Sequence, residues 1–296
     1  MPPMASGAWR ICPTLRDRPG DPCYIPPVHA STATPPIVDP DLLMLAYRSG
    51  IFPMADHRDD PEIFWVEPRR RAILPLDGFH LSHSLAKKLR QGRFAVTCNA
   101  AFAQVMEACA APRRMRDDDD ENGSESWISH RIAASYQRLH DLGHAHSIEC
   151  WHDDALVGGL YGVGFDRVFC GESMFSRMRD ASKMSLAWLV AALRFAGAEL
   201  LDCQFLTPHL ESLGAIEITQ KRYVALLQAA QAPYSGVAAG LGEAGAVAAG
   251  AGAALGEAAG AGGLALPDGF AALLAAAAGS SSSPGNFIAQ LLTQTS

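Results

Sequence analysis

The sequence lacks the short motifs that mark the commonest nucleotide and hydrolase sites. It contains no G-x-x-x-x-G-K-[ST] loop, no G-x-S-x-G elbow and no H-E-x-x-H helix, and its one G-x-G-x-x-G match, at residues 240–245, lies in an alanine- and glycine-rich stretch with no strand pattern before it. These absences disfavour chemistry based on ATP, NAD, a serine triad or a protease zinc ion. Any catalysis must therefore rest on other polar residues.

Paired cysteines and long apolar runs are also missing. The seven cysteines are scattered, with no C-x-x-C pair and no histidine at zinc-finger spacing, so we expect free thiols in a reducing compartment and no metal site. The N-terminus has no apolar stretch of the secretory kind, and the longest apolar helical candidate, residues 184–201, is interrupted by Arg194 and Glu199. These features predict a cytoplasmic protein that does not use a membrane.

Positive charge is scarce overall and absent from the C-terminal part of the chain. The 296 residues hold 24 Lys and Arg against 31 Asp and Glu, a formal net charge of −7. Residues 233–296 contain no Lys or Arg and are dominated by alanine and glycine. Because glycine destabilises a helix interior by about 0.5–1 kcal/mol and no stripe of large apolar residues is evident, we predict that this tail is disordered.

The remaining residues are sufficient for a folded body. An apolar content of 49% over this length allows one large domain or two ordinary ones. The proline-rich residues 1–37 predict a mobile arm. We divide the rest into a small N-terminal domain, 38–79, and a catalytic domain, 80–232.

Hydrophobic periodicity predicts an α+β fold with a mostly antiparallel sheet. Asp39 and Pro40 mark the start of the first helix, Ser82 or Ser84 begins another, and Asn99 is the expected cap of a third. The predicted helices cover 40–49, 100–110, 129–142, 182–196 and 221–231, and the predicted strands cover 63–66, 71–76, 94–98, 147–151, 156–163, 167–170 and 200–206.

Three polar residues stand out near the predicted strands. Glu172 follows a strand and a glycine, which suits a cleft but equally a surface turn. Asp202 and Gln204 share one face of a strand whose other face carries Leu201 and Cys203. Polar side chains on such a strand need partners if buried, or face a site; a hydrated polar face is the alternative.

Two further features are less specific. His144 and His146 are spaced to chelate a metal, but no accompanying ligand set is evident, so we expect them to form structural hydrogen bonds. Basic residues cluster at 69–71, 87–93 and 113–116. Each cluster alone is typical of a solvated face, yet together they would provide the local patch that a polyanion requires.

Longer strings of residues resemble one known family. They include YRSGIFP at 47–53, LGHAHSIE at 142–149, FCGESMFSRM at 169–178 and DCQ at 202–204. In this order they resemble the leucyl/phenylalanyl-tRNA–protein transferases, from about Asp39 to Gln228. The resemblance implies a small N-terminal domain and a C-terminal domain similar to the GNAT acetyltransferases.

The resemblance also implies an activity. Members of this family are cytoplasmic acyltransferases that move leucine or phenylalanine, and less readily methionine, from aminoacyl-tRNA to proteins beginning with Arg or Lys. The product is marked for degradation by the N-degron (N-end rule) pathway. We therefore expect leucyl- and phenylalanyl-tRNA as donors, such proteins or peptides as acceptors, no cofactor, and a monomer.

The resemblance also implies which residues form the site, at the positions of this sequence that match the family. Glu172, Asp202 and Gln204 match the catalytic centre. Met54 stands where well-studied members have Trp, and Leu160 replaces a pocket Met; we expect Met54 to stack on the adenosine with less area than a Trp. The expected aminoacyl and adenosine pocket is lined by Tyr47, Met54, Trp127, Tyr136, Leu160, Phe169 and Leu201, and the expected tRNA contacts are Arg71, Lys87, Lys88 and Arg90.

Conversion of an aminoacyl ester to an amide is downhill, so positioning and charge stabilisation suffice. We predict that the Gln204 carbonyl accepts a hydrogen bond from the attacking amine, that Asp202 orients this amide, and that Glu172 holds the acceptor. The tRNA ribose hydroxyl is an alternative carrier of the proton.

Two other functions remain open. The first is a CoA-dependent N-acetyltransferase, although residues 177–183 lack the glycines of a pyrophosphate loop. The second is a non-catalytic RNA-binding protein on the same fold, which would require loss of the catalytic residues.

Overall fold

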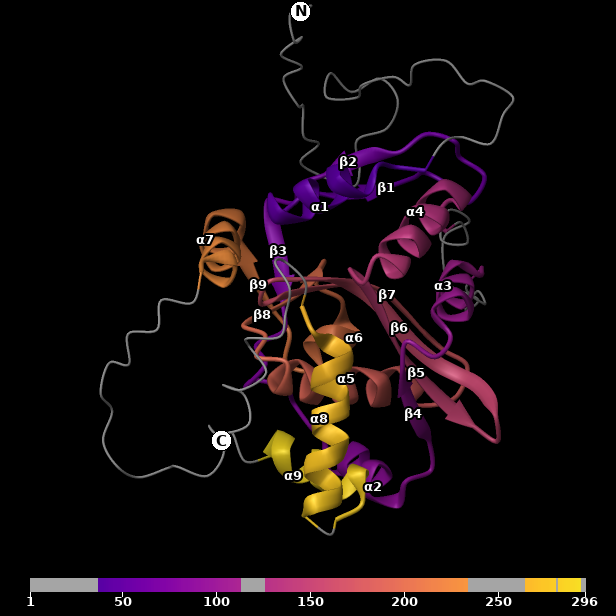
Figure 1. Ribbon diagram of the computed structural model, residues 1–296, viewed down its shortest axis with the longest axis vertical. Helices are drawn as coiled ribbons and strands as arrows, with labels where there is room; N and C mark the ends of the chain where they lie inside the picture. Colours follow the sequence, from indigo (N-terminus) through magenta and orange to yellow (C-terminus); the bar gives the residue numbers. More distant parts are fainter. Residues whose placement is uncertain (1–36, 113–125, 234–263, 281, 294–296) are drawn as a thin grey trace, which may run out of the picture. The chain divides into compact units, whose positions relative to one another are not determined.

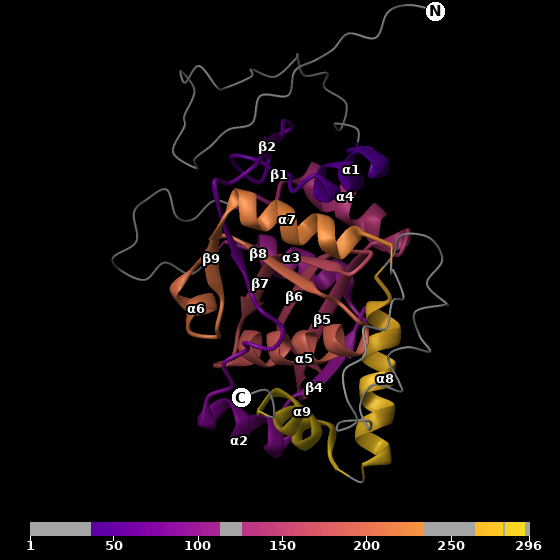
Figure 2. The same ribbon diagram turned by 90° about the vertical axis from the view of Figure 1, so that its left-hand side faces the viewer.

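The structure is a computed structural model that describes residues 37–112, 126–233, 264–280 and 282–293 (Figures 1 and 2). The chain divides into two compact units, one formed by residues 1–69 and 112–135 and the other by residues 70–111 and 136–296. The second unit therefore begins at Arg70, earlier than residue 80. Residues 1–36, 113–125, 234–263, 281 and 294–296 lie outside the described residues, and with them the basic cluster at 113–116 and nearly all of the predicted mobile arm.

The first unit contains a helix and a short hairpin. Helix α1 (Pro40–Arg48) begins where predicted, because the Asp39 side chain accepts hydrogen bonds from the backbone N–H groups of residues 41 and 42. Strands β1 (Phe52–Met54) and β2 (Phe64–Val66) pair antiparallel. The backbone N–H of Ala55 donates to the Trp127 carbonyl at 3.2 Å, which joins the segment after residue 126 to this unit.

The second unit is built on a seven-stranded sheet in the order β4-β5-β6-β7-β8-β3-β9. All neighbouring pairs are antiparallel except β7 and β8. The predicted α+β class is thus confirmed, although β1 and β9 were not predicted. The strands are β3 (Arg70–Ile73), β4 (Ala95–Cys98), β5 (Ala145–His152), β6 (Ala155–Phe165), β7 (Val168–Ser176), β8 (Leu200–Gln204) and β9 (Ile216–Thr219).

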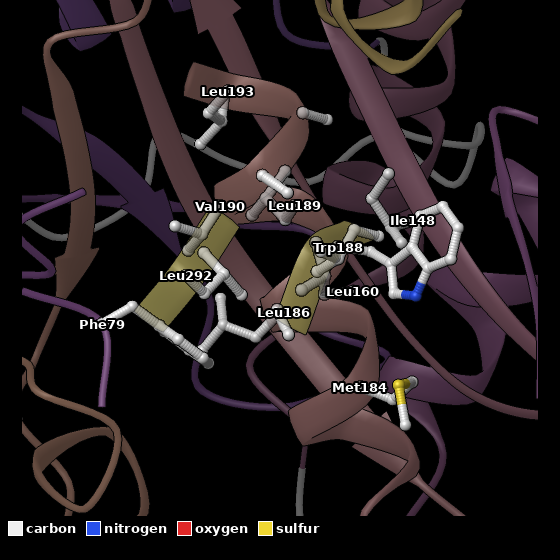
Figure 3. Close-up of a cluster of buried hydrophobic side chains, with 14 of the residues drawn as sticks. Phe79, Ile148, Leu160, Met184, Leu186, Trp188, Leu189, Val190, Leu193 and Leu292 are labelled. Carbon is white, nitrogen blue, oxygen red and sulfur yellow. The ribbon is translucent and has the colours of Figure 1, made fainter. Parts of the chain in front are cut away.

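Helix α5 (Ala181–Phe195) forms the centre of the main core. It is buried almost all round, as expected of a helix that is apolar on every side. Sheet residues such as Leu160 pack on it, and Leu292 of the C-terminal segment joins the same cluster (Figure 3). The other helices are α2 (His83–Gln91), α3 (Phe102–Ala110), α4 (His130–Asp141), α6 (Pro208–Glu211), α7 (Gln220–Gln231), α8 (Leu266–Gly279) and α9 (Pro284–Thr293).

The prediction of a disordered tail is wrong for residues 264–280 and 282–293. Helix α8 crosses α5 and packs against it, and α9 lies by α2 (Figure 2). Small residues make this packing possible: a Cβ added at Gly269 would lie 2.6 Å from the Ala192 carbonyl oxygen, and one added at Gly285 would lie 1.9 Å from that of Leu89. The glycines that argued against helices are therefore their points of closest contact.

The start of α3 also differs from the prediction. Asn99 is not its cap; it has a φ of 59° and bonds to Ser147 instead. The buried Glu149 carboxylate accepts from the backbone N–H groups of Ala100 and Ala101 at 3.3 and 3.4 Å, just before the helix begins. A side chain from β5 thus holds the backbone just before α3, and α3 itself has no side-chain cap.

None of the helices in the described ranges is long and apolar enough to cross a bilayer.

The packing of α8 gives a stability prediction. We expect Gly269→Ala to lower the free energy of unfolding by about 1–3 kcal/mol, because the new methyl group would overlap α5. The control is Gly279→Ala, because a Cβ at Gly279 meets nothing within 4 Å. Urea unfolding monitored by circular dichroism measures both; equal effects of the two substitutions would contradict the docking of α8.

Candidate active site

A network of buried polar side chains crosses strands β3, β7 and β8 in the second unit. The exposed fraction is only 1% for Arg71, 8% for Glu172, 0% for Asp202 and 6% for Gln204. Charged groups are stable at such positions only when they are paired and hydrogen-bonded. The geometry of their partners therefore defines the arrangement.

The Asp202 carboxylate lies at the centre of this network. Arg71 approaches it side-on, with Nε 2.9 Å from Oδ1 and Nη2 2.5 Å from Oδ2. The Tyr223 hydroxyl of α7 donates to Oδ2 at 2.9 Å. Burial opposes the charge of Arg71, but Asp202 and the surrounding groups outweigh it and raise the Arg71 pKa above its ordinary value. The guanidinium therefore stays charged.

Tyr223 is held in its neutral form. Burial first, and then the Asp202 carboxylate, raise the pKa of the Tyr223 hydroxyl well above its usual value. The same two causes raise the pKa of the neighbouring Cys170 thiol. Tyr223 is thus a hydrogen-bond donor, and Cys170 is not poised as a thiolate nucleophile.

Gln204 ends β8 in an unusual backbone conformation. Its φ is +60°, a region that residues other than glycine rarely occupy. The N–H of Phe205 donates to the Cys203 carbonyl at 2.7 Å, which closes a three-residue turn around Gln204. The Gln204 N–H donates to Asp202 Oδ1 at 2.8 Å. The carboxylate therefore holds a strained turn in place.

Glu172 lies in a β-bulge of strand β7. Tyr161 pairs with Ser173 and Gly162 pairs with Gly171, so Glu172 is the extra residue between them. A Cβ at Gly162 would lie 2.2 Å from the Cys170 carbonyl oxygen, so only glycine fits opposite the bulge. Bulges redirect side chains out of the regular alternation of a strand. The redirected Glu172 side chain enters the network.

Glu172 connects Gln204 to an aromatic residue. Gln204 Nε2 donates to Glu172 Oε1 at 2.9 Å, and the Tyr136 hydroxyl donates to Oε2 at 3.0 Å. The structure thus brings Glu172, Asp202 and Gln204 into one continuous network, with Tyr136 at one end. Leu201 points into the core and Cys203 packs against it, as the alternation of the strand predicted. The catalytic role of the three residues stays a prediction.

The remaining expected pocket residues fall into two groups. Tyr47, Met54 and Trp127 belong to the first unit, where Tyr47 is buried and the other two are partly buried. The second unit holds the other group, in the core cluster of α5: Leu160, Phe169 and Leu201. Their role in binding an aminoacyl group or adenosine stays a prediction.

The expected tRNA contacts also separate. Lys87 and Arg90 are exposed on α2, and Lys88 is partly exposed and paired with Asp180. Arg71, in contrast, is buried with its guanidinium against Asp202, so the prediction that it contacts tRNA is wrong. Sequence position alone could not separate Arg71 from exposed arginines in the same cluster.

Of the two histidines at 144 and 146, His146 has a side-chain contact in the structure. His146 Nδ1 lies 3.0 Å from the side-chain nitrogen of Asn99. Burial, and then the charges of His140 and His144, lower the pKa of His146 to about 4. No group of three or more His, Cys, Asp and Glu placed to hold a metal ion occurs within the described ranges.

Sequence reasoning missed Tyr223 altogether. It lies on α7 with Leu227 and Ala230 as a buried stripe, and this spacing is typical of a helix that packs on a core. Nothing in the spacing distinguishes a tyrosine whose hydroxyl meets a carboxylate from one that only fills space.

Comparison with known proteins adds a family. The profile described as leucyl/phenylalanyl-tRNA protein transferase matches residues 73–228, and that of its N-terminal domain matches residues 38–69. A leucyl/phenylalanyl-tRNA–protein transferase of Novosphingobium aromaticivorans is 63% identical over 270 residues, 90% of this chain and 100% of that protein. One from Rhizorhabdus wittichii is 56% identical over 208 residues, 70% of this chain and 79% of that protein.

Solved structures resemble the chain far less. A functionally unknown conserved protein of Staphylococcus epidermidis matches with a TM-score of 0.32 and 10% identity, over 62% of this chain and 65% of that protein. This likeness does not bear on function.

The environment of His146 predicts a dependence of stability on pH. The folded protein keeps this imidazole neutral down to about pH 4, whereas an unfolded chain protonates it near pH 6.5. Between these values the unfolded state binds more protons, so stability falls as the pH falls. We expect His146 to account for a loss of about 3 kcal/mol between pH 7 and pH 4.

Denaturant unfolding of the wild type and His146→Gln at both pH values measures this contribution. The variant should lose less stability on acidification than the wild type. His80→Gln is the control because His80 is exposed, and a loss of pH dependence in the control but not in His146→Gln would contradict the account.

Proposed function

Because this chain belongs to the leucyl/phenylalanyl-tRNA–protein transferase family and is therefore an aminoacyltransferase, we propose that it moves leucine or phenylalanine from aminoacyl-tRNA to proteins that begin with Arg or Lys. Methionine is a poorer donor in this proposal. The enzyme acts as a cytoplasmic monomer, its catalytic domain is GNAT-like, and its products enter the N-degron pathway. The observation that carries the proposal is the buried network of Glu172, Gln204 and Asp202 inside the matched region.

The reaction needs no external source of energy. The neutral α-amine of the acceptor attacks the carbonyl carbon of the aminoacyl ester, a C–N bond forms, and the C–O bond to the tRNA ribose breaks. The amine loses one proton and the ribose oxygen gains one. An α-amine with a pKa of about 7.7–8.0 is partly neutral at cellular pH, so a strong base is not required.

Gln204 is proposed to position the attacking amine. Its amide nitrogen already donates to Glu172, so the carbonyl oxygen Oε1 is the amide atom that can accept a hydrogen bond from the amine. An amide oxygen orients an amine but does not take its proton. The proton is therefore proposed to pass to the departing ribose oxygen, within the substrate itself.

Glu172 is proposed to act on both sides of this amide. It fixes which end of the Gln204 amide faces outward, because a carboxylate accepts hydrogen bonds only from the nitrogen end. Its negative charge also favours an acceptor that carries a positive charge at its N-terminus or on its side chain. Tyr136 holds the second oxygen of Glu172 and so restricts its rotation.

The tRNA is proposed to bind through exposed basic residues of α2. Lys87 and Arg90 are exposed on this helix, and Lys88 lies between them. Contacts of this kind neutralise phosphates and do not depend on base sequence.

A transfer assay tests the proposed function. The wild type should transfer labelled leucine or phenylalanine from charged tRNA to a peptide with N-terminal Arg, and should transfer nothing from acetyl-CoA. We expect Gln204→Ala to lower the single-turnover rate by at least about tenfold, since it removes the group that orients the amine.

The matched control is Gln231→Ala, because this glutamine on α7 donates to the Leu227 carbonyl, and it should transfer at the wild-type rate. A Gln204→Ala variant slowed by less than tenfold would remove Gln204 from the proposed role. Transfer from acetyl-CoA alone would favour the acetyltransferase.

The role of α2 is tested by the dependence of tRNA binding on salt. Each phosphate contact contributes about 0.9 to the slope of log affinity against log salt. We expect the double variant Lys87→Gln with Arg90→Gln to reduce this slope by about 2, whereas Arg138→Gln, an exposed arginine of α4, should leave it unchanged. Filter binding measures the slope, and an unchanged slope in the double variant would contradict this binding surface.

A further inference from the structure

Arg71 and Tyr223 do not act in the proposed reaction, yet both hydrogen-bond the completely buried carboxylate of Asp202. We propose that Arg71 and Tyr223 are positioning residues for aminoacyl transfer, which lock Asp202 against the backbone of Gln204 and so fix the turn that presents the Gln204 amide. This proposal rests on the proposed function and deepens it.

Hydrogen bonds within the protein occupy both carboxylate oxygens of Asp202. Oδ1 accepts from Arg71 Nε and from the Gln204 N–H, and Oδ2 accepts from Arg71 Nη2 and from the Tyr223 hydroxyl. Each oxygen therefore has at least two donors, since Arg71 Nε also lies 3.1 Å from Oδ2, and the side chain is completely buried. Asp202 thus has no oxygen to offer a substrate. Its effect on the reaction must pass through Gln204, the neighbour that it holds.

Asp202 also maintains the unusual backbone conformation of Gln204. A glutamine at a φ of +60° is disfavoured, and such residues keep their conformation only when surrounding contacts impose it. The bond from the Gln204 N–H to Asp202 is such a contact. If the carboxylate turned away, the turn would relax. The Gln204 amide would then no longer lie between Glu172 and the substrate.

Two side chains from different elements, Arg71 and Tyr223, hold Asp202. Arg71 approaches on β3, which lies beside β8 in the sheet, and Tyr223 approaches on α7. The Arg71 guanidinium carbon lies 4.5 Å from the centre of the Tyr223 ring, so the two side chains also orient each other. A buried ion pair is weak evidence for stability, since apolar residues of similar volume often serve equally well. The planar, two-point geometry of the Arg71–Asp202 pair instead suits the positioning of a third group, here the backbone of Gln204.

Two conservative substitutions weaken this lock to different degrees. Tyr223→Phe keeps the ring and removes one hydrogen bond, and we expect the single-turnover transfer rate to fall about tenfold. Arg71→Lys keeps the charge and removes the two-point geometry, and we expect a fall of about a hundredfold. The affinity for charged tRNA should stay within about twofold of the wild type. The control is Arg222→Gln, an exposed neighbour of Tyr223 on α7.

A double-mutant cycle separates positioning from a general loss of structure. Transfer is measured for the wild type, Tyr223→Phe, Gln204→Ala and the double variant, together with their unfolding midpoints. If Tyr223 acts through Gln204, Tyr223→Phe slows the wild type but has no further effect in the Gln204→Ala background. Equal slowing in both backgrounds, or no slowing in either, would overturn the proposal.

The outcomes distinguish this proposal from the function on which it rests. Absence of transfer by the wild type would overturn both. Transfer by the wild type with additive effects in the cycle would overturn only the positioning role. Should Arg71→Lys fail to fold, the cycle with Tyr223→Phe still decides.

Discussion

The arrangement of the site depends on one buried ion pair, between Asp202 and Arg71. Two side chains with almost no exposure face each other in strands β8 and β3, and they come from positions 131 residues apart. Because an unpaired charge is so unfavourable in a protein interior, the pair fixes how these two strands and α7 come together. The strained turn at Gln204 and the contact with Glu172 then follow from the position of Asp202.

The second constraint is close packing at small residues. Gly162 admits the bulge that redirects Glu172, and Gly269 and Gly285 admit the C-terminal helices. In each case the space for a single methyl group is already taken by backbone atoms. Glycine therefore serves two purposes in this chain: at Gly162 it shapes the site, and in α8 and α9 it allows helices to approach α5 and α2. Both purposes depend on distances that only the fold creates.

Local signals in the sequence predicted the local structure well. Asp39 and Pro40 predicted the start of α1, and Ser82 that of α2, because a cap acts on residues within one turn. Alternation also predicted that Asp202 and Gln204 lie opposite Leu201. Features that depend on distant partners were not predictable. They include the burial of Arg71, the hydroxyl contact of Tyr223, the bonds of Glu149 to the backbone before α3 and the helices of the tail, whose small residues carry no strong hydrophobic pattern.

The central claim is that the network from Asp202 to Glu172 presents Gln204 to the attacking amine. The most direct test is a crystal structure of the protein with a non-hydrolysable aminoacyl-adenosine analogue and a peptide that begins with Arg. The account predicts that the peptide's α-amino nitrogen lies within hydrogen-bond distance of Gln204 Oε1, about 2.6–3.2 Å, and faces the aminoacyl carbonyl carbon. A complex in which both ligands bind away from Gln204 and Glu172 would contradict it.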